Sequence, residues 1–195
     1  MGLDMYLNKA KRVGEVTVNE LLALDSYFSY IARPNKYRDC TSEKWCGLDM
    51  KDVNLDLVED YITEYTHRYS YWDTEKEYGY KTIFEQIGYW RKANHIHNWF
   101  VENVQDGVDE CDTYEVTKEQ LEDLLSVCKE VLNNSDIGDS SVARKLLPTT
   151  SGFFFGGTEY DEWYYKDVEN TVRIIEDTLR TTDFEHEVVM YRSSW

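Results

Sequence analysis

The stretch Leu146–Tyr165 constrains the fold more than any other part of this sequence, because it concentrates residues with special backbone behaviour. Gly152 and the pair Gly156–Gly157 enclose three consecutive phenylalanines, Phe153–Phe155. Glycine adopts backbone conformations that other residues avoid, so these positions predict sharp changes of chain direction. We therefore expect Phe153–Phe155 to form a short buried strand between two turns.

A long amphipathic segment follows. Thr158 and Asp161, three positions apart, predict a capping box, and apolar residues at helical spacing then predict a helix over 159–181. A glycine-bounded strand that leads into a helix N-terminus can present free backbone N–H groups to an anion. Two interpretations stay open: a tight turn that docks a long helix on a sheet, or an anion-binding loop.

Length and composition indicate a globular protein. With 195 residues, 42% of them hydrophobic and 15% aromatic, the chain can bury a substantial core. We expect a single globular domain over 1–195, with an irregular, aromatic-rich insertion at about 34–80. The tyrosine-rich part of this insertion, 65–80, fits either an exposed hairpin or the outer face of a sheet.

The acidic charge restricts the partners. The 38 Asp and Glu against 21 Lys and Arg give a formal net charge of −17, which repels nucleic acid backbones and anionic membranes. We therefore expect no direct nucleic-acid partner and no membrane partner. The even spread of charge favours a solvated acidic surface, but a basic host protein or a surface that imitates DNA also fits.

The cysteines and the N-terminus indicate the cellular compartment. The four cysteines contain no CxxC pair, and Asp4, Lys9 and Lys11 interrupt the opening apolar residues, so no signal sequence is expected. No apolar stretch is long enough to span a membrane. These features predict free thiols and a reducing cytoplasm.

Hydrophobic periodicity predicts an α+β fold with a small, mainly antiparallel sheet packed by about five helices. The sheet is expected to contain strands at Leu3–Leu7, near 81–88 and at Phe153–Phe155, with a final strand around Val188 and Met190. Helices are expected near 19–32, 55–66, 90–104, 117–133 and 159–181. Thr117 and Gln120 predict a capping box at the start of the fourth of these helices.

The helix expected at 90–104 has an unusual polar stripe. Its members are Arg91, Asn94, His95, Asn98 and Glu102. Asparagine is unfavourable inside a helix unless its amide has a partner, and Glu or Lys would solvate a helix face better. This stripe is therefore a candidate binding face.

Known site motifs are largely absent. His95 and His97 are two residues apart, which directs them about 200° apart on a helix, so they cannot chelate one ion. No zinc-finger spacing, EF-hand, phosphate-binding loop or G-x-S-x-G sequence occurs. We expect no metal and no cofactor. Cys128 lies on an apolar helix face and is expected to be a small core residue.

Three segments carry a resemblance to a known family: Met1–Leu7 (MGLDMYL), Tyr89–Phe100 (YWRKANHIHNWF) and Leu147–Trp163 (LPTTSGFFFGGTEYDEW). The chain resembles a family of uncharacterised proteins encoded by bacteriophages and prophages. This resemblance implies a viral origin and a place in the host bacterial cytoplasm, and it transfers no activity. By analogy, small acidic phage proteins often counteract host defence by sequestering a signal nucleotide or blocking an effector.

The leading hypothesis is a non-enzymatic phage accessory protein that binds a small anionic, nucleotide-like ligand. Arginine would hold phosphate, asparagine would read base or ribose edges, and aromatic rings would stack on the base. The expected ligand-binding residues are Arg91, Asn94, His95, Asn98, Ser151, Phe153, Thr158, Tyr160 and Trp163.

Two alternatives belong to other classes. One is an acidic protein-interaction inhibitor, or DNA mimic, that blocks a host effector. The other is a nucleotide-directed hydrolase or transferase in which His95 or His97 acts as general acid or base, Arg91 holds phosphate and Tyr160 donates a hydrogen bond. Against catalysis stands a purely structural interpretation, with His97 in the core and His95 exposed.

Overall fold

The computed structural model describes residues 2–12, 17–19, 21–22, 25, 63–70, 75–135 and 139–195, with the backbone alone over 63–70 and 75–82. The chain divides into two compact units, one of residues 1–9 with 86–195 and the other of residues 10–85. The prediction of a single domain with an insertion at 34–80 stays a prediction.

The second unit contains an antiparallel strand pair, β2 (Thr63–Ser70) and β3 (Glu75–Thr82). Thr63 pairs with Thr82, and Ser70 pairs with Glu75. The described backbone of the tyrosine-rich segment thus forms a β-hairpin. The prediction of a helix at 55–66 is wrong at residues 63–66, which belong to β2. The other residues of that expected helix lie outside the described part, as does most of the helix expected at 19–32, of which residues 19, 21, 22 and 25 are helical.

The first unit is built on a four-stranded antiparallel sheet in the order β4-β1-β6-β5. Its strands are β1 (Asp4–Lys11), β4 (Glu85–Arg91), β5 (Thr113–Val116) and β6 (Glu187–Ser194). The expected N-terminal and final strands are confirmed, and the strand expected at 81–88 begins and ends later as β4. Strand β5 was not predicted.

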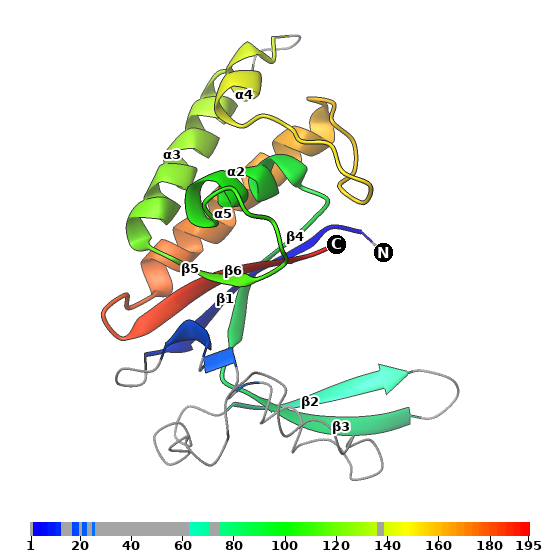
Figure 1. Ribbon diagram of the computed structural model, residues 1–195, viewed down its shortest axis with the longest axis vertical. Coiled ribbons are helices and arrows are strands. Elements are labelled where there is room, and N and C mark those ends of the chain that lie inside the picture. Colours follow the sequence, from blue (N-terminus) through cyan, green and yellow to red (C-terminus); the bar gives the residue numbers. More distant parts are fainter. Residues whose placement is uncertain are drawn as a thin grey trace. The chain divides into compact units, whose positions relative to one another are not determined.

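Helices lie together over one side of this sheet (Figure 1). They are α2 (Asn94–Val104), α3 (Lys118–Asn133), α4 (Ser141–Leu146) and α5 (Glu162–Thr181). The α+β fold is confirmed, with four helices bounded in the described chain instead of five. The short helix α4 was not predicted.

The two long helices begin at different kinds of cap. Thr117 and Gln120 form the predicted capping box at α3, with side-chain to backbone bonds in both directions. At α5 the expected box is wrong, because Asp161 itself is the N-cap and accepts bonds from the N–H groups of Trp163 and Tyr164. A carboxylate is also favoured there by the helix dipole.

The core lies between the sheet and the helices. Phe100 of α2 stacks on Tyr191 of β6, with ring centroids 3.9 Å apart and planes 9° apart. Gly88 of β4 lets α5 approach the sheet closely, since a Cβ there would lie 2.7 Å from a side-chain carbon of Ile174. Cys128 is fully buried, as predicted, and burial raises the pKa of its thiol to about 12. The buried residues of α2 are Asn94–His97 and Trp99–Val101.

The strand expected at Phe153–Phe155 is wrong. These residues form a turn in which the Phe155 N–H donates to the carbonyl of Gly152 at 3.2 Å. A strand needs a partner for its backbone groups, and the sheet order offers none to this segment.

Candidate functional site

The turn around the three phenylalanines is held against the start of α2 by one side chain. We call residues Thr149–Gly157 the aromatic loop. The Asn94 amide donates to the carbonyls of Phe155 at 3.1 Å and Gly157 at 2.7 Å, and its oxygen accepts from the N–H of Thr150 at 3.0 Å. The expected helix face and the expected loop are therefore adjacent, with Asn94 buried between them and fully used by its own chain.

Backbone contacts hold the other side of the aromatic loop. The N–H of Leu3 donates to the carbonyl of Phe154 at 3.1 Å, and the Leu3 carbonyl accepts from the N–H of Lys92 at 2.8 Å. Gly156 has φ +91° and faces Lys92, whose Cβ would lie 3.1 Å from an added Cβ. Lys92 itself has φ +60°, a conformation uncommon outside glycine, and this places its backbone at the junction of β4, α2 and the loop.

The solvent side of this junction combines aromatic and cationic groups. Phe153 is 94% exposed, and its ring meets that of Phe154 edge to face at 4.6 Å. Lys92 is exposed and makes no ion pair within the described chain, while the Arg91 side chain is 60% exposed and lies 3.9 Å from Asp4. An exposed ring therefore lies on a well-held loop whose Gly156 packs on Lys92, in a chain of net charge −17.

The remaining expected ligand residues lie around the loop in different settings. Tyr160 is half-buried, accepts from the N–H of Thr149 at 3.1 Å and lies under the guanidinium of Arg144 at 4.5 Å. Trp163 is 70% exposed, with the ammonium of Lys166 over its ring. Ser151 and Thr158 are exposed, and Asn98 is half-buried.

The start of α5 cannot receive an anion as expected. The Asp161 carboxylate already occupies the N–H groups of Trp163 and Tyr164. A second anion there would meet the Asp161 charge instead of free donors. An anion bound near the aromatic loop must therefore be held by side-chain cations and not by the N-terminus of α5.

His95 is buried and not exposed, which contradicts the structural interpretation of the sequence. It is 3% exposed, its ring lies 4.1 Å from that of Tyr164, and its Nε2 has no hydrogen-bond partner in the described chain. Burial lowers the pKa of His95 to about 3, so the imidazole is neutral near pH 7.

His97 is a satisfied core residue, as that interpretation expected. Its Nδ1 lies 2.8 Å from the Tyr191 hydroxyl, and its Nε2 lies 2.9 Å from Oδ2 of Asp109. The indole N–H of Trp195 donates to the other oxygen of Asp109 at 3.1 Å. His97 is 1% exposed, so its ring is out of reach of a ligand at the aromatic loop.

Sequence reasoning missed Lys92, Asp109, Tyr191 and Trp195. Lys92 is adjacent to Arg91 in sequence, and the dibasic pair was the available signal for it. The link from Asp109 to His97 and Trp195 depends on the pairing of β5 with β6, which no local pattern revealed.

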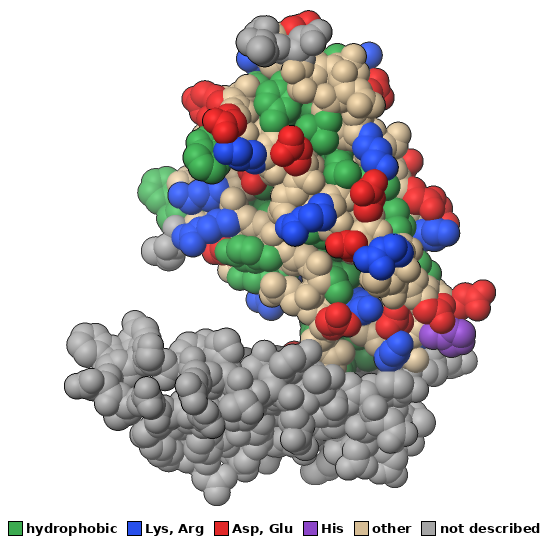
Figure 2. All heavy atoms as spheres, turned by 180° about the vertical axis from the view of Figure 1, so that it is seen from behind, with side chains coloured by type: hydrophobic (Ala, Val, Ile, Leu, Met, Phe, Trp, Pro, Cys, Tyr) green, Lys and Arg blue, Asp and Glu red, His purple; other side chains and the backbone are tan. Residues whose placement is uncertain are grey.

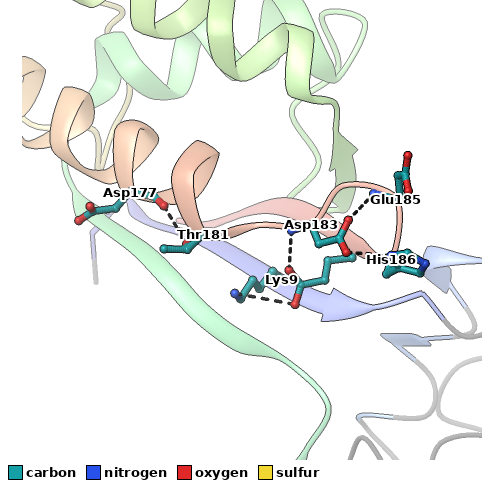
Figure 3. Close-up of polar contacts among 7 residues, drawn as sticks. Lys9, Asp177, Thr181, Asp183, Glu185 and His186 are labelled. Atoms are coloured by element: carbon teal, nitrogen blue, oxygen red, sulfur yellow. Dashed lines mark hydrogen bonds and ion pairs between the residues drawn. The ribbon is translucent and has the colours of Figure 1, made fainter.

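A second charged cluster lies at the turn between α5 and β6 (Figure 3). Asp183, Glu185 and His186 have ligand atoms within 4.8 Å of one another, and all three are exposed. Asp183 accepts from the N–H of Glu185 and from the imidazole of His186, and this second bond lowers the pKa of Asp183. These bonds stabilise the turn, and they account for the close approach of the three side chains. Lys9 pairs with the adjacent Glu187 at 3.9 Å.

Comparison of the chain with protein-family models, with curated proteins and with solved structures gives no match. The site must therefore be interpreted from its own geometry. No helix in the described ranges is long and apolar enough to cross a membrane.

Proposed function

We propose that this protein binds a small anionic, nucleotide-like ligand at the aromatic loop, without transforming it. The observation that carries the proposal is the exposed Phe153 ring on a loop that Asn94 and Leu3 hold in place. Gly156 of the same loop packs on Lys92, which follows Arg91 in the sequence. A planar base would stack on the phenylalanine ring, and the two cations would hold its phosphates. A loop ordered before binding loses less conformational entropy on binding.

The net charge of −17 opposes an anion at long range but not at this junction. Charges more than about 8 Å apart are largely screened at physiological ionic strength, so the nearest groups dominate. Here those groups are Arg91 and Lys92, with Asp4 as the acid nearest to Arg91. The proposed ligand set accordingly leaves out Asn94 and His95, which are buried, keeps Arg91 and Phe153, and adds Lys92.

The burial of both candidate histidines supports a binder over an enzyme. A general acid or base must come within hydrogen-bonding distance of the reacting group. His95 and His97 are 3% and 1% exposed, and His97 already has a partner on each nitrogen. The resemblance to phage proteins supports a host bacterium as the setting of this binding, where sequestering a signalling nucleotide would counteract defence.

The proposal is tested by a thermal-shift and titration panel of mononucleotides, dinucleotides and cyclic nucleotides. We expect stabilisation by at least one of them, lost in Phe153→Ala and in the double variant Arg91→Ala/Lys92→Ala. Lys129→Ala removes an exposed cation that pairs with Glu176 and serves as the matched control. Denaturing the complex and analysing the released ligand separates the classes, since an altered ligand means catalysis. No shift with any nucleotide contradicts the proposal.

Contact with a basic host protein is the second candidate. The acidic segment before β5 supports it: partial burial and the carboxylates of Asp112, Glu110, Asp106 and Asp109 raise the pKa of Tyr114. Figure 2 shows acidic and basic side chains intermixed on one face, which is unlike the continuous rows of a DNA mimic. A charge-driven partner recovered from host lysate should dissociate as salt rises.

A further inference from the structure

The hydrogen-bonded groups around His97 are not used by the proposed ligand site. We call His97, Asp109, Tyr191, Trp195 and Phe155 the His97 cluster. Because a carboxylate only accepts hydrogen bonds, Nε2 of His97 donates a proton to Asp109, and Nδ1 of His97 lies 2.8 Å from the Tyr191 hydroxyl. Asp109 then accepts from the indole of Trp195 at 3.1 Å. The cluster thereby connects α2, the segment before β5, and β6.

Phe155 connects this cluster to the aromatic loop. Its ring meets His97 edge to face, with centroids 5.2 Å apart and planes at 85°. It also meets the ring of Trp195 at 5.9 Å and 70°. Its carbonyl accepts from Asn94, and its N–H donates to Gly152. Phe155 is therefore the inward side of the loop, while Phe153 is its exposed side.

We infer that Asp109 and Trp195 are positioning residues that act through Phe155 to hold the aromatic loop in its binding conformation. The inference rests on the proposed function and names what controls that site. In the described part of the chain, neither residue makes a hydrogen bond or a ring contact with Phe153, so each would act through a partner.

The exposure of the two residues separates this inference from ordinary core packing. Tyr191 and His97 are fully buried, so replacing either would loosen the whole unit. The Asp109 side chain is 24% exposed and Trp195 is 48% exposed, so they lie at the accessible end of the cluster. Loss of either should release Phe155 and leave the helices packed.

Amide hydrogen exchange on the full chain, without ligand, tests the inference. The N–H groups of Thr150 and Phe155 report the loop, because each is hydrogen-bonded there. We expect Trp195→Leu and Asp109→Ala to speed exchange at these amides by roughly tenfold or more, with α3 unchanged. Trp195→Phe keeps a ring against Phe155 and should give a smaller increase. Lys129→Ala is the control and should change neither.

Unchanged loop exchange in both Trp195→Leu and Asp109→Ala overturns the inference. An equal increase in α3 also overturns it, because that indicates general destabilisation. If Asp109→Ala does not fold, the graded pair at Trp195 decides. Titration of the wild-type protein with the nucleotide panel keeps the two proposals apart: failure to bind any of these nucleotides removes the proposed function, while the exchange result still decides the coupling.

Discussion

His95 and His97 lie two residues apart on α2, and both are buried, yet their surroundings differ. Each ring nitrogen of His97 has a partner, one from β6 and one from the acidic segment. His95 has a ring contact with Tyr164 and an unpartnered Nε2 in the described chain. On the same helix, His97 is therefore hydrogen-bonded to two other segments, whereas His95 packs against an aromatic ring.

This difference shows that burial alone does not define the role of a histidine. Burial without a charged partner lowers the pKa of His95 to about 3. His97 instead links the sheet, the acidic segment and the aromatic loop. The surroundings of His95 and the surroundings of His97 should therefore respond differently to substitution and to acid.

The largest effect is expected from His97→Ala. This variant leaves the buried Tyr191 hydroxyl and one oxygen of Asp109 without their partner and creates a cavity, so the free energy of unfolding should fall by about 4 kcal/mol. Urea denaturation measures it. His95→Phe keeps a ring on Tyr164 and removes the unpartnered nitrogen, so its stability should stay within about 1 kcal/mol of wild type. Equal losses in the two variants would remove the distinction between the histidines.

Acid should weaken the fold through His95. Its pKa in the folded state is about 3, below the unfolded value near 6.5, so protonation favours the unfolded chain as pH falls below 6.5. Between pH 7 and pH 5 this group alone should cost about 2 kcal/mol. Urea denaturation of wild type and His95→Phe across this range isolates the term. A slope that persists unchanged in His95→Phe contradicts it.

Asn94→Ala should cost about 1–2 kcal/mol, because three hydrogen bonds to the aromatic loop disappear. Asn98→Ala is the matched control on the same helix, since no hydrogen bond of its side chain is formed in the described chain. Denaturation of both variants compares them. A loss at Asn98 as large as that at Asn94 would show that helix context, and not the loop, sets the cost.

The sequence predicted elements whose signals are local. The Thr117–Gln120 capping box and the apolar stripes of α3 and α5 depend on neighbours within a turn, and both were confirmed. The unusual cost of a helical asparagine correctly marked Asn94 as needing a partner. The partner proved to be the chain itself, which spacing along the sequence cannot reveal.

The predictions that were wrong concern residues whose structure depends on contacts with distant parts of the chain. Three phenylalanines predicted a strand, but strand formation requires a free sheet edge beside them. The structural interpretation had His95 exposed, yet Tyr164 of α5 covers the histidine. Arg91, expected on the same helix stripe, belongs to β4. The contact between Asp109 and His97 depends on the path that the chain takes before it enters β5.

A smaller effect is expected from Asp167→Asn. Burial, and then the charge of Asp161, raise the pKa of Asp167 to about 6. The neutral form is favoured in the folded state, so this contribution to stability is present below the unfolded pKa and is lost as pH rises through 6. The amide should therefore add up to about 1 kcal/mol at pH 7, limited by solvent screening, and nothing near pH 4. Its pH dependence is opposite in sign to that of His95. Equal effects at the two pH values would contradict it.

The smallest effect on stability is expected from Phe153→Ala, within about 0.5 kcal/mol, because the ring is 94% exposed. Urea denaturation measures it, and Trp163→Ala, at another exposed ring, is the control. A loss above about 2 kcal/mol would mean that Phe153 is packed in the fold.

The central claim is that the loop held from beneath by Asn94 and the His97 cluster presents a binding surface for an anionic, aromatic ligand. Amide chemical-shift mapping during titration with the nucleotide that gives the largest thermal shift, or with ATP if none does, tests it most directly. The account predicts saturable shifts at Arg91, Lys92 and Phe153–Gly156, absent in Phe153→Ala. Shifts confined to the Asp183–His186 turn, or no saturable shifts at all, would contradict it.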